Sequence, residues 1–334
     1  MITPFSVFSQ TEIAASVNLI PNSYGRLGQM NLMPLSGVPT NSIAIEEVNG
    51  SLSLLPTNLS GGPGSVGQTG KRVVRTFTIP KVEHGEHANP LEIQNVRGLG
   101  GNELMNMAQL LTQKLTTARG KHDITLEHLR MGALKGIILD ADGSTVISNL
   151  YTEFGISQKS VDFVLGTATT EIRDKCYEVV RHVEDNLKGE VSSGVHALVS
   201  AEFFDKLIKH AKVKEAYANY QEAAQRLGGD VRKGFTFGGI TFEEYRGTAT
   251  GSAGSAVRFI ASGEGHAFPT GTMNTFATFV GPADFNESIN SLGQLYYAKV
   301  AASKFDRGYD IHTQMNPLPM CKRPGVLVKL TTSN

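Results

Sequence analysis

The chain contains the glycine-rich run Gly61-Gly62-Pro63-Gly64-Ser65-Val66-Gly67-Gln68-Thr69-Gly70-Lys71-Arg72, which is followed directly by Val73-Val74-Arg75-Thr76-Phe77-Thr78-Ile79-Pro80. The first run resembles a phosphate-binding loop, which requires Gly-x-x-x-x-Gly-Lys-Ser/Thr between a strand and a helix. Ser65 stands where the first glycine is needed, and Arg72, which cannot ligate magnesium, follows Lys71. The second run is β-branched, alternates and ends at a proline, so it predicts a strand and not a helix. Without a helix N-terminus behind the loop, the pattern argues against a nucleotide site.

The two runs are better interpreted as the mobile tip and one strand of a long basic β-hairpin. Residues 42–48 alternate as well, and Asn49-Gly50 predicts a tight turn toward a second alternating stretch at 52–55. A two-stranded hairpin cannot bury itself, so we expect it to lie on another surface. Alternation places Lys71 and Arg72 on opposite faces, which suits contacts with proteins at least as well as a nucleic-acid track. The candidate interface residues here are Gly64, Gly67, Gly70, Lys71, Arg72 and Arg75.

Composition narrows the function classes. The 334 residues include 31 Lys plus Arg and 31 Asp plus Glu, so the net charge is zero. Such a chain has no global attraction to nucleic acid or an anionic membrane, and near-zero charge favours self-association. Cys176 and Cys321 have no metal or redox spacing, which indicates a reducing, cytosolic origin. No apolar run approaches the ~20 residues needed to span a bilayer, and no secretory signal pattern occurs.

The local patterns predict a mixture of helices and strands. Four prolines interrupt residues 1–40, which we expect to be extended and held by a neighbouring subunit. A long helix is predicted from about Asn102 to Gly136, with a bend or break at 120–123. Residues 81–89 are expected to form a charged loop. A hairpin is predicted to turn at Asp142-Gly143. Helices are predicted at 168–188, from the cap Ser200 in stretches as far as about 227, and, as a short helix, at 284–291. Strands are predicted at 195–199, 235–237, 240–246 and 257–261, with a loop at 247–255.

The sequence motifs that could indicate catalysis or metal binding are weak. Zinc-binding His-Glu-x-x-His places its histidines four apart on a helix, whereas His84 and His87 are three apart in a predicted loop. No Gly-x-Ser-x-Gly motif occurs, so no nucleophile elbow is indicated. We therefore predict no catalytic residue, cofactor site or metal ligand. The alternative is an α/β enzyme or ligand-binding protein that uses the His84/His87 loop, with a deep pocket and a monomeric or small oligomeric state. A nucleic-acid-binding module would need a patch of one sign, which the balanced charge disfavours.

One segment carries a family resemblance. The run Asn316-Pro317-Leu318-Pro319-Met320-Cys321-Lys322-Arg323-Pro324-Gly325-Val326-Leu327-Val328-Lys329-Leu330 resembles the closing signature of the lambda-like major capsid proteins of tailed bacteriophages, the capsid protein E family. Other pieces similar to that family follow in its order along nearly the whole chain. They are Tyr24-Gly25-Arg26-Leu27-Gly28, Ile43-Ala44-Ile45-Glu46-Glu47, the glycine-rich tip with Arg75-Thr76-Phe77-Thr78-Ile79-Pro80, Leu134 to Gly143, His266 to Gly271, Gly281 to Phe285 and Leu292 to Lys299.

The resemblance implies an α+β fold of the Hong Kong 97-like capsid type. Its parts would be an N-terminal arm (1–40), an extended β-hairpin loop (41–97), a peripheral domain with a spine helix (98–150), an axial domain (151–270) and a C-terminal segment completing both domains (271–334). It adds Tyr24 and Arg26 to the candidate interface residues.

The same resemblance implies a function as a major capsid protein. Homo-pentamers and homo-hexamers would build an icosahedral shell, which assembles on a scaffold and expands as DNA is packaged. Further expected partners are portal and decoration proteins, with weak non-specific contact to packaged DNA and no membrane contact. The expected location is the virion capsid, assembled in the cytoplasm of the bacterial host.

Overall fold

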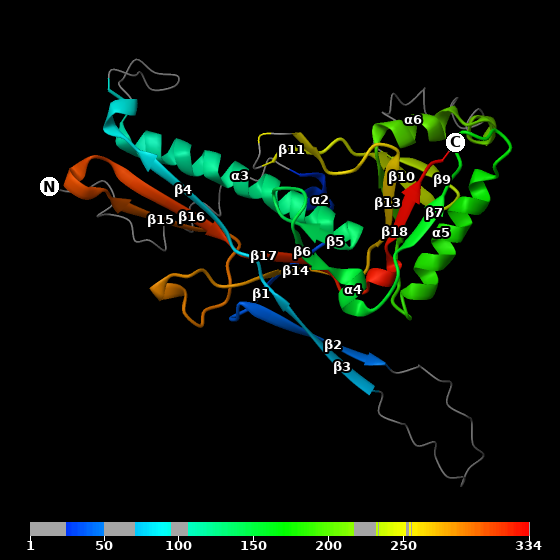
Figure 1. Cartoon of the computed structure of the whole chain (residues 1–334), viewed down its shortest axis with the longest axis horizontal. Coiled ribbons are helices and arrows are strands. Elements are labelled where there is room, and N and C mark those ends of the chain that lie inside the picture. Colours follow the sequence, from blue (N-terminus) through cyan, green and yellow to red (C-terminus); the bar gives the residue numbers. More distant parts are fainter. Residues whose placement is uncertain are drawn as a thin grey trace, which may run out of the picture.

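The computed structural model describes residues 25–49, 71–94, 106–216, 232, 234–251, 254 and 256–333. The molecule is elongated, and helix α3 (Met107–Lys135) runs along much of its length (Figure 1). A six-stranded sheet with two helices forms one end, and a three-stranded sheet forms the other. The hairpin of β2 (Ser42–Asn49) and β3 (Lys71–Thr78) projects from the middle, away from the rest of the body (Figure 1).

Helix α3 is one unbroken rod of 29 residues, or about 44 Å at ~1.5 Å per residue. Asn106 accepts a hydrogen bond from the Gln109 N–H, and the Gln109 side chain accepts one from the Asn106 N–H, so a capping box starts the helix. Gly136, with φ +77°, ends it. The predicted cap Asn102 lies outside the described residues. The predicted break at 120–123 is wrong, because buried side chains on this turn, Ala118, Arg119, His122 and Asp123, hold it against the body.

The hairpin pairs in full antiparallel register from Ser42↔Thr78 to Asn49↔Lys71, which confirms the strand predicted after the glycine-rich run. The strand predicted at 52–55 and the glycine-rich tip at 61–70 lie outside the described residues. The described partner of β2 is therefore β3, across a connection that begins at Gly50.

Two three-stranded sheets pack beside α3. One has the order β1 (Leu35–Gly37), β14 (Phe276–Val280) and β17 (Pro317–Cys321). The other has the order β15 (Tyr297–Ala302), β16 (Tyr309–Met315) and β4 (Val82–Ala88). Strand β4 corrects the prediction of a charged loop at 81–89. Its burial alternates, and the half-buried Val82, His84 and Glu86 share one face, so the period-two pattern is present but is built mostly from polar residues.

The six-stranded sheet forms the α/β end of the molecule. Its order is β7 (Lys159–Asp162), β18 (Val328–Thr331), β13 (Glu264–Thr270), β8 (Gly194–Val199), β10 (Ile240–Glu244) and β9 (Phe235–Phe237). The helix predicted at 168–188 is confirmed as α5 (Ile172–Asn186), whose apolar stripe of Ile172, Cys176, Val179 and Val183 is buried. Ser200 caps α6 (Ala201–Lys209) as predicted, by accepting the Phe203 N–H at 3.2 Å. A further helical turn follows at 211–216, and residues 217–231 lie outside the described residues.

Smaller elements complete the fold. Strands β5 (Ile137–Leu139) and β6 (Val146–Asn149) form the predicted hairpin, in which Asp142 accepts the N–H groups of Ser144 and Thr145. The predicted loop at 247–255 contains strand β11 (Thr248–Thr250). It pairs as a hairpin with β12 (Ala256–Arg258), which overlaps the strand predicted at 257–261. The remaining short elements are α2 (Arg26–Met30), α4 (Leu150–Phe154), and the 3₁₀ turns at Pro90–Glu92, Asn286–Ser288, Lys304–Asp306 and Pro324–Val326. Among the described helices, none is long and apolar enough to cross a membrane.

The core has two parts that α3 joins. The larger part runs from the hairpin base, through the C-terminal half of α3, to the six-stranded sheet. The smaller part packs the N-terminal half of α3 against β4, β15 and β16. The root of the hairpin and Leu27 of the segment that starts at Gly25 both belong to the larger part, and these two junctions are the candidate functional regions.

Candidate functional site

The root of the β2–β3 hairpin is built into the core. Ile43 and Phe77, which are register partners, are 7% and 4% exposed, and Ile79 just beyond β3 is also buried. On the opposite face of β3, Val74 is 55% exposed, and exposure alternates along the described part of the strand. The hairpin is thus built into the core by one face at its base, presents its other face to solvent, and projects from the body in Figure 1.

Arg75 joins the hairpin to helix α4. Its Nε donates to the Glu153 carbonyl at 2.8 Å, and its guanidinium lies 4.8 Å from the centre of the Phe154 ring. Phe77 stacks on the same ring at 6.0 Å between centroids. A cation over an aromatic face and a charged hydrogen bond both restrain direction. Arg75 therefore helps to set the angle at which the hairpin leaves the body.

The other candidate residues of the hairpin are farther from the body. Lys71 and Arg72 occupy the distal end of β3, and their side chains lie outside the description. Gly64, Gly67, Gly70 and Tyr24 lie outside the described residues.

The segment that starts at Gly25 forms a second junction, and it corrects the prediction that residues 1–40 are extended. Residues 26–30 form helix α2, and Leu27 is 2% exposed. Glu127, from the middle of α3, accepts the N–H groups of Leu27 at 2.8 Å and Gly28 at 3.3 Å. A carboxylate at a helix N-terminus satisfies otherwise unpaired N–H groups and interacts favourably with the helix dipole. The capping group comes from about 100 residues away, so local sequence does not reveal it.

Gly25 is required by this arrangement. Its φ of +102° disfavours any L-residue, and a Cβ added there would lie 2.4 Å from Glu127 Oε2. The same carboxylate accepts the Tyr245 hydroxyl at 3.0 Å, just after β10. Glu127 therefore ties α2, α3 and the six-stranded sheet together at one point.

Arg26 is bound within its own subunit. Its Nε donates to Glu243 Oε1 at 2.6 Å and its Nη2 donates to Glu243 Oε2 at 3.1 Å. His196 Nε2 also lies 3.1 Å from Glu243 Oε2. Burial alone would raise the pKa of Glu243, but hydrogen bonds from His196 and Arg26, together with the Arg26 charge, lower it below its usual value. The pKa of Arg26 is raised by its hydrogen bond to Glu243. Arg26 is 40% exposed at its side chain, and its role at a subunit interface stays a prediction.

A buried polar cluster on α3 was missed by the sequence analysis. Asp123 accepts the Tyr296 hydroxyl and contacts Arg119 at 3.4 Å, and the Arg119 guanidinium lies 3.8 Å from the centre of the Tyr296 ring. His122 lies 2.9 Å from Thr313 Oγ1, and burial lowers the pKa of its imidazole to about 4. Polar residues at four-residue spacing, 119, 123 and 127, inside a helix are the signal that could have indicated this cluster.

The His84/His87 pair is separated by the strand. Residues three apart on β4 face opposite sides of the sheet: His84 pairs with Glu86 at 2.8 Å beside Lys121, whereas His87 pairs with Asp310 at 2.8 Å. Within the described residues, no group of three or more His, Cys, Asp or Glu side chains is placed to hold a metal ion. The two histidines thus make two separate hydrogen-bond contacts on opposite faces of the strand.

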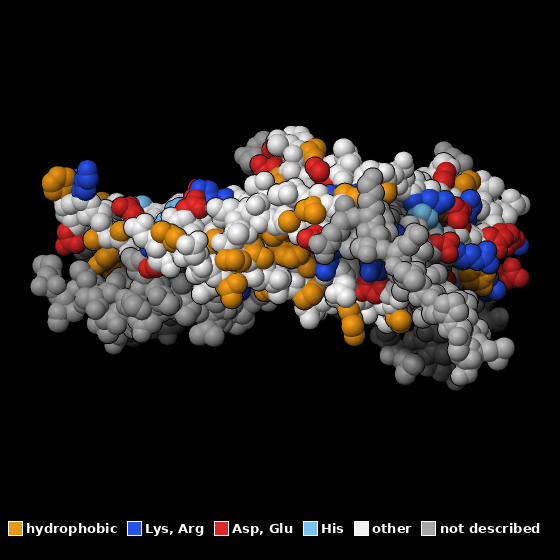
Figure 2. Space-filling model, turned by 90° about the horizontal axis from the view of Figure 1, so that it is seen from below, with side chains coloured by type: hydrophobic (Ala, Val, Ile, Leu, Met, Phe, Trp, Pro, Cys, Tyr) orange, Lys and Arg blue, Asp and Glu red, His pale blue; other side chains and the backbone are white. Residues whose placement is uncertain are grey.

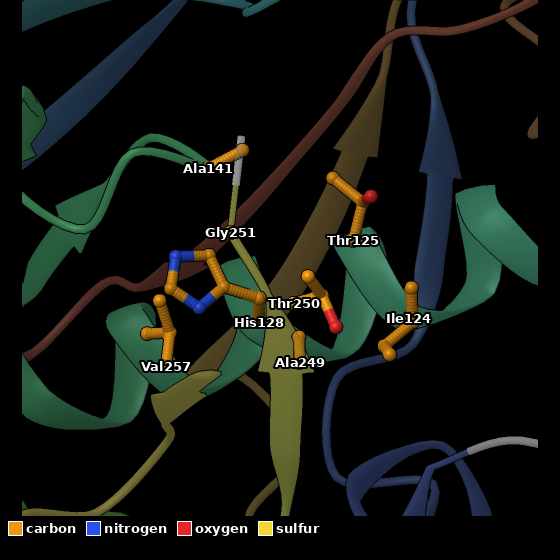
Figure 3. A pocket seen from close by; sticks show the side chains of 8 residues that line it. All are labelled: Ile124, Thr125, His128, Ala141, Ala249, Thr250, Gly251 and Val257. Atoms are coloured by element: carbon orange, nitrogen blue, oxygen red, sulfur yellow. The ribbon is translucent and has the colours of Figure 1, made fainter. Parts of the chain in front are cut away.

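The pocket in Figure 3 is small. It has a volume of about 60 Å³, and it lies between α3, the β5–β6 turn and β11. Ligand pockets are typically ~300–1,000 Å³, so this space suits a few waters. Its one titratable side chain, His128, points across the pocket in Figure 3, contacts the Asp140 carbonyl at 3.2 Å and packs on Phe259. This arrangement contains no pair of groups for acid–base or nucleophilic catalysis.

A family model and two curated relatives match nearly the whole chain. The family model described as phage major capsid protein E matches residues 9–332. The chain is 32% identical to the major capsid protein of Pseudomonas phage KPP10, over 96% of each chain. It is 31% identical to the major capsid protein of Salmonella phage Felix O1, over 97% of this chain and 96% of the other.

Solved structures share the fold. The putative capsid protein of a prophage of E. coli CFT073 superposes with a TM-score of 0.65 at 15% identity, over 98% of this chain and 99% of the other. The capsid protein of Myoviridae phage XM1 gives a TM-score of 0.51 at 8% identity, over 100% and 99%.

These relatives are structural proteins that assemble with copies of themselves into a capsid shell. The chain accordingly forms part of the virion capsid and is not an enzyme, which overturns the alternative based on His84 and His87. The chain belongs to the phage major capsid protein E family and has the Hong Kong 97-like capsid fold.

Proposed function

We propose that this chain forms pentamers and hexamers that close into an icosahedral shell around packaged DNA, with each β2–β3 hairpin lying across a neighbouring subunit. The observation that carries the proposal is the projecting hairpin itself, whose one face is buried at Phe77 while its opposite face is exposed at Val74. Eight residues per strand make an element of about 27 Å, and an isolated two-stranded hairpin is at best marginally stable in water. A neighbouring surface would supply the burial that the hairpin lacks within its own subunit.

The candidate interface residues divide into two roles in this proposal. Gly64, Gly67, Gly70, Lys71 and Arg72 would contact the neighbour, and bending at the glycines would adapt one sequence to five- and six-fold surroundings. Arg75 and Arg26 would act indirectly, because each is bound to its own subunit, through Glu153 and Glu243 respectively. They would orient the hairpin and the arm that contains Tyr24.

The domain roles follow the same scheme. Residues 1–40, which include α2 and β1, would form the N-terminal arm, and 41–97 the extended loop with β4 returning to the body. Residues 98–150 would form the peripheral domain, 151–270 the axial domain near the capsomer axis, and 271–334 would complete both. The six-stranded sheet supports this division, because β18 from the C-terminal segment pairs between β7 and β13.

The remaining partners are proposed from function. A scaffold would guide assembly in the host cytoplasm, and a portal would replace one pentamer. Decoration proteins would bind the outer surface. The zero net charge suits an inner wall that contacts DNA weakly and without sequence preference.

Negative-stain electron microscopy of the purified chain, expressed with and without its neighbouring genes, tests the proposal. We expect closed shells or capsomer rings. Deletion of Gly61–Gly70 tests the hairpin in the same assay, and we expect a folded subunit that fails to close shells. Normal shells from the deletion variant would refute the role of the hairpin. A uniformly monomeric intact chain under both conditions would contradict assembly into pentamers and hexamers.

A further inference from the structure

The connection between β15 and β16 carries an exposed aromatic side chain, Phe305. Among the described large hydrophobic side chains, Phe305 has the greatest exposure, 89%. Its backbone has φ +65° and ψ +24°, the left-handed region that disfavours residues other than glycine. Asp306 follows with φ +55°. Phe305 thus contributes almost no buried area to its own subunit and occupies a strained backbone, which is the opposite of what folding alone favours.

Most of the residues beside Phe305 in sequence are charged. We call residues 304–307 the tip; Lys304, Asp306 and Arg307 give it a net charge of +1. Figure 2 shows hydrophobic and Lys or Arg side chains projecting together at one end of the molecule, with acidic side chains close by. Aromatic residues and arginine are typical of the residues that carry binding energy in protein interfaces, and the tip contains one of each.

A complementary depression lies elsewhere on the same subunit. It has a volume of about 460 Å³ and is lined by residues before β2, around Pro282 and around the 3₁₀ turn at Asn286–Ser288. We call it the groove. Its walls include Pro39, Pro282, Ala283 and Ile289, and Ile289 is 68% exposed. Asp284 gives it an acidic group, which is 52% exposed and 2.7 Å from Lys81.

The tip cannot reach the groove of its own subunit. The groove residues precede β15 and the tip follows it, and the six residues of β15 span about 20 Å of strand paired along its length with β16. When the tip and the groove lie at separate places on each subunit, binding of one to the other is a heterologous contact. Such contacts close into a ring when the rotation that relates neighbouring subunits allows it. Such a contact occurs only between copies.

We propose that the tip of one subunit inserts Phe305 into the groove of another subunit, where Ile289 and the prolines cover the ring and Asp284 faces the basic residues of the tip. The inference rests on the proposed assembly into a shell and adds a specific contact to it. Because the groove includes Pro39 to Asn41, directly before β2, this contact would also brace the hairpin root of the receiving subunit.

Paired cysteines test the contact in assembled particles. Native Cys176 and Cys321 are fully buried, so new surface cysteines can be followed. The double variant Phe305→Cys/Ile289→Cys is treated with a short bismaleimide, and we expect a covalent ladder on a denaturing gel. The matched control is Leu91→Cys/Ile289→Cys, because Leu91 is also strongly exposed, at 78%; we expect no ladder from it. Particles that remain uncrosslinked in the Phe305/Ile289 variant, or dimers from Phe305→Cys alone, would overturn the proposal.

Phe305→Gly separates assembly from folding. Glycine relieves the left-handed backbone, so the thermal midpoint of the unassembled subunit should stay equal or rise, while the yield of particles should fall at least tenfold. Particles at the normal yield would contradict the contact. Failure of the unmodified chain to form particles under any co-expression is a different result, since it would remove the proposed assembly together with this contact.

Discussion

Gly25→Ala should destabilise the subunit far more than an ordinary glycine substitution. A methyl group at Gly25 would lie 2.4 Å from Glu127 Oε2 and 2.7 Å from its Cδ, at a φ of +102°. The backbone strain costs about 1–3 kcal/mol. Displacing the Glu127 carboxylate also weakens its bonds to Leu27, Gly28 and Tyr245, and a hydrogen bond to a charged group contributes about 1.5–3 kcal/mol. We expect a total loss of about 3–6 kcal/mol in the free energy of unfolding.

Urea denaturation of the unassembled subunit, followed by circular dichroism, measures this loss. The control is Gly155→Ala, at φ +65°, where an added Cβ meets nothing within 4 Å. It should cost only about 1–2 kcal/mol. Combining Gly25→Ala with Glu127→Ala should cost less than the sum of the two single variants, because the clash needs both side chains. Equal losses for Gly25→Ala and Gly155→Ala, or full additivity with Glu127→Ala, would refute the clamp.

Three further predictions concern α3 and the hairpin. His122 is held neutral by burial, with a pKa of about 4 when folded and 6.5 when unfolded, so the unfolded chain binds more protons between these values. Stability should fall by on the order of 2–3 kcal/mol as the pH drops from 6.5 to 4, and denaturation of His122→Gln across that range should show a flatter slope. Gly120→Ala should stabilise the subunit by about 0.5–1 kcal/mol in urea, since an added Cβ meets nothing within 4 Å in this helix; a loss would mean that the helix needs the glycine. Arg75→Lys should lower particle yield with little effect on the thermal midpoint, because lysine cannot reproduce the planar contact with Phe154; unchanged particles would contradict the orienting role.

Sequence predicted those elements whose signals are local. The β-branched run at 73–79, the apolar stripe on α5 and the Asp142-Gly143 turn each carry their pattern within a few residues, and each is confirmed. Strand β4 was missed because the half-buried positions of its alternating pattern include histidine and glutamate where apolar residues would be expected. This face of the strand packs against α3, where Glu86 forms an ion pair with Lys121. Helix α2 was missed because its cap is Glu127, about 100 residues away.

The candidate site shows the same division. The sequence indicated that the hairpin and the segment around Arg26 take part in assembly, since neither could bury itself locally. It could not indicate that Arg75 and Arg26 are bound within the subunit, because Glu153 and Glu243 become their neighbours only when distant segments pack. Phe305 offered no pattern in sequence, and its significance depends on its exposure and backbone conformation.

The buried polar residues of α3 have a further consequence for the shape of the subunit. Removing ionised groups from water is costly, and apolar packing would often hold a helix as well. Directional contacts, however, need a specific partner on another element: Asp123 with Tyr296, His122 with Thr313 and Glu127 with the start of α2. Sliding α3 by one turn, about 5.4 Å, would separate all three from these partners, whereas leucines would find new neighbours. The contacts therefore fix the position along α3 at which α2 and the two ends of the molecule attach, and this fixes the geometry that every copy presents to its neighbours.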